Sequence, residues 1–141
     1  MKYLIDTCVA SELIKRRPAV QVVRWFATVP GEDVYLPSIA IGEIQKGISK
    51  LTPGDSKRLR LEAWLAGVRR DFSHKIVPFD EDSAILWGRT IGEFARIGRT
   101  LPIVDTQIAA IALVNDMTLV TRNVDDMAGM GVPIFNPFAE S

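Results

Sequence analysis

The chain has 141 residues, of which 48% are hydrophobic and 24% charged, as is usual for one globular domain, and this excludes a disordered or fibrous protein. Its 17 basic and 17 acidic residues balance, so the net charge does not select a class of partner. The single cysteine, Cys8, excludes an internal disulfide and favours a reducing, cytoplasmic setting.

The apolar runs argue against a membrane or secreted protein. Only Tyr3-Leu4-Ile5 separates Lys2 from Asp6, which leaves no room for the core of a signal peptide. The longest strongly apolar run, Ile108–Val114, is far too short to cross a bilayer. We therefore expect a cytoplasmic protein that does not bind membranes.

Hydrophobic periodicity predicts strands and helices that alternate along the chain, without a repeat, a linker or a hairpin signal. The predicted strands are residues 3–5, 34–36, 75–78 and 119–120, with 134–135 as a candidate for the last one. The predicted helices are residues 8–15, 19–29, 38–51, 57–72, 81–97 and 102–115, with Ser38 and Asp80 as N-caps. This alternation predicts one domain over residues 1–141, a three-layer α/β/α fold around a central, mainly parallel sheet.

The first predicted strand is followed at once by an acid, Asp6, and then by a hydroxyl and a thiol. In parallel sheets the functional crevice lies beyond the carboxyl ends of the strands, and Asp6 falls there. Asp6 is therefore either the cap of the next helix or one wall of an active site. Its immediate neighbours leave both interpretations open.

Two further acids lie on helices with apolar surroundings. Glu43 is followed by Ile44, and a buried carboxylate at this place needs a partner. The alternative is a tilted helix that lets Glu43 pair with Lys46 or Lys50 at the surface. Asp105 lies in the first turn of its helix, where the helix dipole favours any acid. Each acid alone fits an ordinary structural role.

The last polar cluster, from Thr121 to Asp126, follows a strand as Asp6 does. It is either a loop in which Asn and Asp make turns or another source of oxygen ligands for the same crevice. Three or four carboxylates that converge in a low-dielectric crevice repel one another, and a divalent cation relieves that repulsion. Oxygen ligands suit Mg²⁺ or Mn²⁺ better than zinc.

Four motifs stand at these places: LIDTCVASEL, PSIAIGEIQKGI, PIVDTQIAAIA and TRNVDDM, the last followed by GV and NP. With them the chain resembles the PIN-domain ribonucleases, and most closely the VapC-type toxins of bacterial toxin–antitoxin modules. The motifs run from end to end of the chain in the order of the family. The ordered set is specific, whereas a single Asp-Thr pair is not. The resemblance implies a PIN-like fold.

The resemblance carries over to single residues. Four acids match the catalytic, metal-binding positions of the family: Asp6, Glu43, Asp105 and Asp126. Family members vary in which residue of the last motif supplies the ligand. We choose Asp126, with Asn123 second and Asp125 third.

Other motif positions have supporting roles in this interpretation. Thr7 and Thr121 are expected to position a water or a carboxylate, and Asn123 supports the fourth position. The chain departs from the family at Cys8, where Asn or Ser is usual. The sequence therefore does not say whether the side chain at this position makes the hydrogen bond expected there. Met127 replaces a common Phe.

The resemblance further implies hydrolysis of RNA phosphodiester bonds with Mg²⁺ or Mn²⁺, by the toxin of a type II toxin–antitoxin pair. It implies a homodimer, held inactive by a cognate antitoxin protein that reaches into the acidic site. Binding of RNA also needs positive charge near that site. We expect this charge from five residues after the first and on the third helix: Lys15, Arg16, Arg17, Lys46 and Lys50.

Two other classes of function stay open at this point. One is a non-catalytic PIN-like binding module that assembles with a DNA-binding partner, against which the intact set of acids argues. The other is a receiver-like or phosphatase-like α/β domain with an acidic Mg²⁺ pocket. A phosphatase of that kind has a second acid two residues after the first, where this chain has Cys8. A receiver has a Lys after a late strand, whereas the last lysine here is Lys75.

Overall fold

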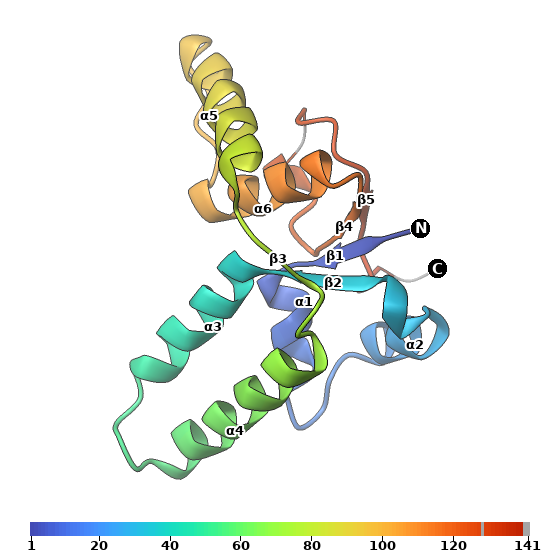
Figure 1. Cartoon of the computed structure of the whole chain (residues 1–141), viewed down its shortest axis with the longest axis vertical. Coiled ribbons are helices and arrows are strands. Elements are labelled where there is room, and N and C mark those ends of the chain that lie inside the picture. The colour runs from blue at the N-terminus through green and yellow to red at the C-terminus, as the bar shows by residue number, and fades with distance from the viewer. Residues whose placement is uncertain (128, 140–141) are drawn as a thin grey trace.

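A sheet of five strands forms the middle of the molecule in the computed structural model, which describes residues 1–127 and 129–139 (Figure 1). All neighbouring strands are parallel, and their order is β3-β2-β1-β4-β5. The strands are β1 (Tyr3–Ile5), β2 (Val34–Pro37), β3 (Ile76–Val77), β4 (Thr118–Val120) and β5 (Ile134–Phe135). They are short, and the first of them is the central one.

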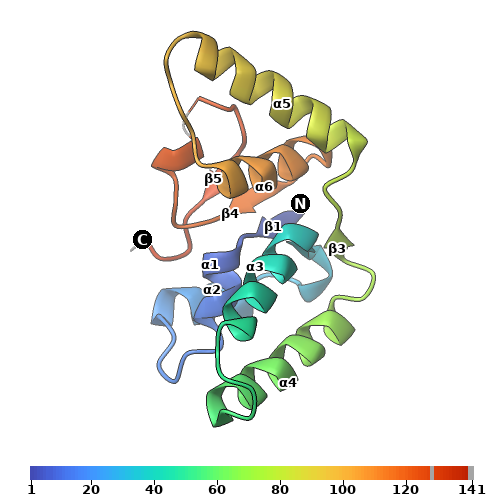
Figure 2. The same cartoon turned by 90° about the vertical axis from the view of Figure 1, so that its left-hand side faces the viewer.

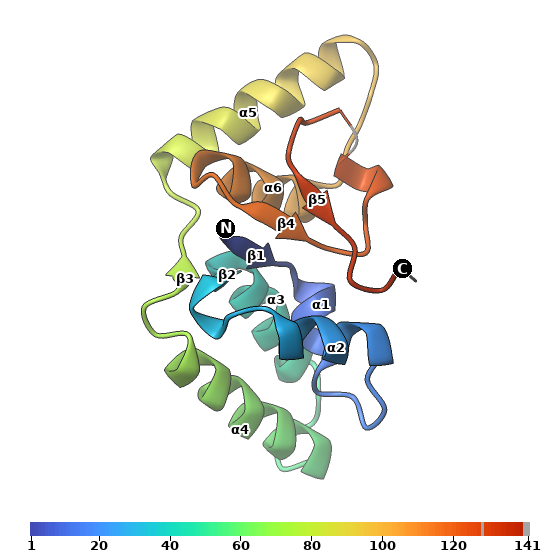
Figure 3. The same ribbon diagram turned by 90° about the vertical axis from the view of Figure 1, so that its right-hand side faces the viewer.

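Helices cover both faces of the sheet (Figures 2 and 3). On one face lie α1 (Thr7–Glu12), α2 (Val20–Thr28), α3 (Ser38–Ser49) and α4 (Ser56–Asp71). On the other face lies α6 (Ile103–Val114), and α5 (Glu81–Arg96) packs on α6. Two 3₁₀ turns, η1 (Gly31–Asp33) and η2 (Asp125–Met127), lie in the loops. The predicted three-layer α/β/α fold with a parallel sheet is confirmed.

Alternation along the strands produces the two cores. In β1, Leu4 packs toward α6 while its neighbour Ile5 packs toward α1 to α4. In β4, Leu119 likewise packs toward α6, and Val120 packs toward α1 to α4. Successive side chains of a strand point to opposite faces, so a strand covered on both sides reads as a continuous apolar run. The helices cover both faces of the sheet. None of the helices in the described part of the chain is long and apolar enough to cross a membrane.

The strand order places a topological switch point next to β1. The chain runs from β1 outward to β2 on one side, and β4 later pairs with the other side of β1. At such a point the connections leave in opposite directions and a crevice opens beyond the carboxyl ends of the strands. Asp6 follows β1 and Thr121 follows β4, so both belong to this crevice. The fold itself therefore brings two distant motifs together.

The predicted helices and strands all exist, and their ends agree with the prediction to within three residues. Asp80 is the N-cap of α5, as predicted, and its carboxylate accepts a hydrogen bond from the Ser83 N–H at 2.9 Å. The prediction that Ser38 is an N-cap is wrong: Pro37 holds that position and Ser38 begins the helix. Pro37 is extended and ends β2, so strand and helix join with no residue between them.

Candidate active site

Asp6 is the residue around which the crevice is built. It is only 3% exposed, and it is the N-cap of α1. Its Oδ1 accepts a hydrogen bond from the Val9 N–H at 3.2 Å, which satisfies a donor that every helix N-terminus leaves free. The predicted cap is therefore present. The capping contact uses Oδ1 and leaves Oδ2 to another partner.

Two side chains hold the same carboxylate from other directions. The Cys8 thiol donates to Oδ1 at 2.8 Å, and the Thr121 hydroxyl donates to Oδ2. Thr121 is itself fixed, because its Oγ1 accepts a hydrogen bond from the Asn123 N–H at 3.0 Å. Donors to a carboxylate favour its ionised form and restrict its rotation. Asp6 is thus a fixed carboxylate, held by groups from two strand ends.

Glu43 reaches the crevice from α3. Its side chain is half-buried, and its Oε1 accepts a hydrogen bond from the Thr7 hydroxyl at the start of α1. The alternative pairing with Lys46 or Lys50 does not occur, since no ion pair of Glu43 is found in the described part of the chain. The pairing of α1 with α3 therefore orients Glu43 toward the residues that follow β1.

Asp105 and Asp126 approach from the other face of the sheet. Asp105 lies in the first turn of α6, and the turn η2 that carries Asp126 packs against this helix. Burial, followed by the negative charges of Asp6 and then Asp126, raises the pKa of the Asp105 carboxyl to about 6. A hydrogen bond to Asp126 and the charge of Glu43 act in the same direction. The three other predicted acids therefore all act on the Asp105 carboxyl.

The three candidates for the fourth position are separated by their surroundings. Asp126 is half-buried, and its charge and its hydrogen bonding with Asp105 both raise the pKa of the Asp105 carboxyl. Asn123 is half-buried and contributes its backbone N–H to Thr121. Asp125, in the same turn as Asp126, is exposed. The geometry thus joins Asp126 directly to the acidic cluster of Asp6, Glu43 and Asp105.

Cys8 has a role that the sequence left open. Burial, with the adjacent Asp6 charge as the next cause, raises the pKa of its thiol to about 12. The thiol therefore stays protonated at neutral pH and acts as a hydrogen-bond donor to Asp6. A neutral thiol is a poor nucleophile, so nothing here resembles the activated cysteine of a covalent mechanism. Its place in the motif, two residues after the acid, was the only signal for this contact.

The donor set of the cluster fits a hard divalent cation. The four carboxylates offer oxygen ligands, which Mg²⁺ and Mn²⁺ prefer. The raised pKa of Asp105 reflects its burial and, after that, repulsion from neighbouring carboxylates that a cation relieves. Among residues 1–127 and 129–139, no three His, Cys, Asp or Glu side chains form a ready-made metal centre. The carboxylates are near enough to act on one another, yet not closed around a single point.

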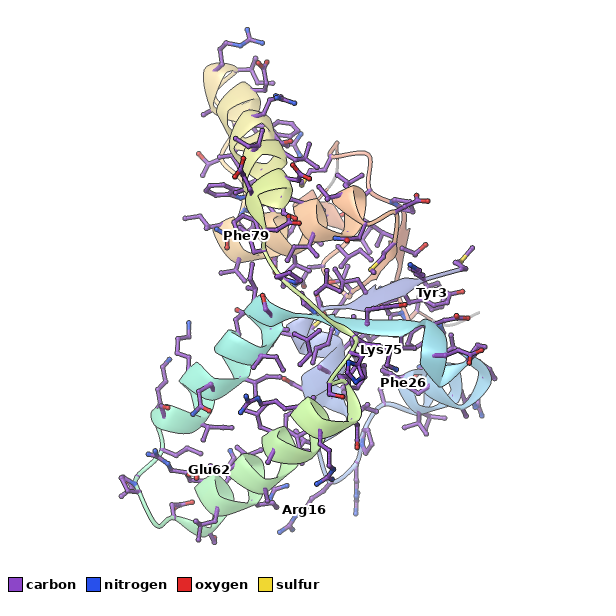
Figure 4. The ribbon with its side chains drawn as sticks, viewed as in Figure 1. Tyr3, Arg16, Phe26, Glu62, Lys75 and Phe79 are labelled. Atoms are coloured by element: carbon purple, nitrogen blue, oxygen red, sulfur yellow. The ribbon has the colours of Figure 1, made fainter. Side chains whose placement is uncertain are left out.

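The basic residues are arranged differently from the expectation. Of the five expected around the site, Lys15 lines a groove that also holds Thr7 and Glu43, whereas Arg16 is exposed and points outward from the α1–α2 loop (Figure 4). The same groove contains Lys57 and Arg60 of α4, which were not expected there. Their clustering in the sequence was visible, but only the packing of α4 on α3 brings them to this side.

A family model and similar proteins of known name point to the same family for this chain. Residues 3–130 match the family model described as PIN domain. The toxin FitB of Neisseria gonorrhoeae is 31% identical over 135 residues, which cover 96% of this chain and 97% of FitB. The VapC ribonuclease Y4jK of Sinorhizobium fredii is 25% identical and covers 96% of each chain.

Comparison with solved structures finds the same group of proteins. A solved structure of FitAB bound to an IR36 DNA fragment contains a chain that superimposes with a TM-score of 0.88 at 31% identity. The match covers 99% of this chain and 97% of that one. Sequence and fold therefore agree with FitB along nearly the whole length of both chains.

Proposed function

We propose a function for this chain from one premise: it belongs to the PIN domain family. It is a ribonuclease that hydrolyses RNA phosphodiester bonds, and it acts as the toxin of a type II toxin–antitoxin pair. Relatives named as a toxin and as a VapC ribonuclease support this function. The observation that carries it is the joint action of Asp6, Asp126 and Glu43 on the pKa of Asp105. Such clustering of carboxylates is unfavourable to folding unless a cation compensates it.

Four carboxylates would hold the cation: Asp6, Glu43, Asp105 and Asp126. The bound Mg²⁺ or Mn²⁺ supplies a water of lowered pKa and screens the charge of the scissile phosphate. The chain positions these ligands through two threonines: Thr121 holds Asp6, and Thr7 holds Glu43. The Cys8 thiol serves as a donor to Asp6 and takes no covalent part.

The test of this function is growth arrest in bacteria that express the chain alone. Asp6→Asn is the informative variant, because Asn caps a helix as well as Asp does while removing the charge. Asp80→Asn is the matched control, since Asp80 makes the same capping contact on α5, outside the site. We expect wild type and Asp80→Asn to stop growth and degrade cellular RNA. Asp6→Asn, present at the same level, should do neither.

An equally toxic Asp6→Asn protein would return Asp6 to the role of a helix cap and remove the basis of the proposal. A non-toxic wild type that leaves RNA intact would point to the alternative function, a PIN-like module that assembles with a DNA-binding partner. Both outcomes are read from the same cultures by growth curves and RNA gels.

The cognate antitoxin is the expected protein partner in the cytoplasm. FitB occurs in a FitAB assembly on DNA, which supports a DNA-binding partner here as well. Because the crevice is acidic, the antitoxin should present an Arg or Lys to it, as a charge-assisted donor to carboxylates. A structure of the complex in which no cationic side chain lies near Asp6 or Asp105 would contradict this.

A homodimer is the expected assembly of the toxin itself. Three isoleucines on α5, at its C-cap and at the start of α6 are largely exposed: Ile85 at 56%, Ile97 at 66% and Ile103 at 63%. Large apolar side chains that are exposed on a monomer are often covered in an assembly. Ile97→Asp should shift the mass in light scattering from dimer to monomer, and an unchanged mass would contradict this face.

A further inference from the structure

A groove opens beside the acidic cluster, between α1, α3 and α4. Its volume is about 440 Å³, and it begins at Thr7 and Glu43, which also belong to the crevice. Its lining also includes Lys57, Arg60 and Trp64 of α4. Helices α3 and α4 run next to each other along it (Figure 2). The groove is therefore continuous with the site but lies outside it.

The charges along the groove are basic, apart from Glu43 at the end nearest the site. Lys15, Lys57 and Arg60 are all exposed. Lys15 forms an ion pair with Glu12 at 2.7 Å, whereas Lys57 and Arg60 form none with any described carboxylate. Arg60 donates to the carbonyl oxygen of Ile14 at 3.4 Å. Two cations of α4 thus stay available to an external anion.

The floor of the groove is apolar and includes an aromatic ring. Ile44, Ile48 and Leu61 line it together with Trp64, which is half-buried. Sites that bind single-stranded nucleic acids without sequence preference combine such a floor with a basic rim, because bases stack on aromatic rings while Lys and Arg contact the phosphates. The groove contains both parts within one continuous surface.

We infer that this groove binds the single-stranded RNA that flanks the scissile phosphate, with phosphates on Lys57 and Arg60 and a base on the floor beside Trp64. The inference rests on the proposed function and assigns α4 a part in it. RNA that enters the acidic crevice meets repulsion from four carboxylates. A basic groove at the rim offsets this repulsion and holds the strand in register with the site.

The test compares two double variants that each remove two positive charges. Lys57→Ala/Arg60→Ala changes the groove. Arg24→Ala/Arg69→Ala is the matched control, because Arg24 and Arg69 are exposed on α2 and α4 but do not line the groove. Affinity for a single-stranded RNA oligonucleotide is measured in EDTA over a range of salt concentrations. Steady-state cleavage of the same RNA is measured in Mn²⁺.

Each lost phosphate contact to a single strand reduces the slope of log affinity against log salt concentration by about 0.7. The slope of the groove variant should therefore be smaller than that of wild type by about 1.4. Its KM should rise roughly tenfold with kcat unchanged at saturating RNA. The control should match wild type in both. Lys57→Arg/Arg60→Lys, which keeps both charges, should restore the slope.

Fluorescence gives a second, independent readout of the floor. RNA binding should quench the emission of wild type, and Trp64→Phe should lack that part of the quenching. Trp25 and Trp87 lie outside the groove and remain as internal references.

Three results would overturn the inference. If wild type cleaves RNA while both double variants keep its salt slope and KM, the groove does not bind RNA and the proposed function stands. If Lys57→Ala/Arg60→Ala instead loses affinity only for the antitoxin, the groove belongs to a protein partner. If wild type neither binds nor cleaves RNA, the proposed function fails and takes this assignment with it.

Discussion

Asp105 has two interpretations, and they predict opposite changes in the free energy of unfolding when the residue is replaced by Asn. As an idle acid in the first turn of α6 it would stabilise the helix through the dipole, by roughly 0.3–1 kcal/mol. As a member of the acidic cluster it is destabilised by its neighbours, which is the direction of its raised pKa. Neutralising it therefore distinguishes a structural from a functional carboxylate.

Asp105→Asn should make the metal-free protein at least as stable as wild type. The expected gain in the free energy of unfolding is on the order of 1 kcal/mol, because solvent screens part of the repulsion at a half-buried carboxylate. Mn²⁺ should raise the Tm of wild type by mass action and that of the variant much less. Thermal melts in EDTA and in millimolar Mn²⁺ measure both effects.

Asp82→Asn serves as the control for these melts, since Asp82 is an exposed acid in the first turn of α5. It should lose a little stability and respond to Mn²⁺ as wild type does. If Asp105→Asn behaves like Asp82→Asn, Asp105 is not in the site.

The raised pKa of Asp105 also predicts how the metal-free protein responds to pH. The folded chain binds a proton at Asp105 up to about pH 6, whereas the unfolded chain releases it near the ordinary value of 3.8. Between these values the folded state holds more protons, so this group makes stability fall as pH rises. Melts of wild type and Asp105→Asn in EDTA should therefore diverge from about pH 4 to pH 6. Parallel curves across this range would contradict the assigned burial and repulsion.

The α5 N-terminus shows what a capping acid does when it has no functional neighbours. The Ser83 N–H holds the pKa of Asp80 below its usual range. The capping contribution is thus present above the ordinary pKa of aspartate and is lost as pH falls through the lowered folded value. Asp80→Ala should lower the Tm by a few degrees at neutral pH, with no change in metal response or RNA cleavage.

This loss should disappear in strongly acidic buffer, where the wild-type carboxyl is protonated as well. A Tm difference that persists unchanged in acid would assign the effect to packing instead of the charged cap.

At the level of helices and strands, local rules predicted most of the fold. Caps such as Asp80 and breakers such as Gly98, whose φ is +79°, depend on neighbouring residues and can be recognised in the sequence. Ser38 was assigned wrongly because β2 runs directly into α3, so the cap position falls on Pro37. The 3₁₀ turns η1 and η2 were not predicted, since three-residue turns leave no periodicity to detect.

The groove could not be predicted from the sequence for a different reason. Lys57 and Arg60 stand far from the four acids of the site in the chain order, and their clustering suits a solvated helix face equally well. Only the angle at which α4 packs on α3 turns them toward Glu43. Contacts of this kind depend on tertiary packing, which local patterns do not encode.

For the whole molecule, the site follows from the order of the strands. A parallel sheet with β1 at its centre brings the end of β1 next to the end of β4, so Asp6 meets Thr121 across 115 positions of sequence. Helices from both faces then add Glu43 and Asp105. The four acids were identified from motifs and strand ends, but the hydrogen bond from Cys8 required the folded chain.

The central claim is that this crevice hydrolyses RNA by means of its four carboxylates. The most direct measurement is cleavage of a defined RNA by the purified, antitoxin-free protein, in EDTA and then with Mn²⁺ or Mg²⁺ restored. We predict no cleavage in EDTA, recovery with either metal, and loss of the recovered activity in Asp105→Asn by at least a hundredfold, as expected when a metal ligand is removed. Cleavage that continues undiminished in EDTA, or that Asp105→Asn retains in full, would contradict the claim.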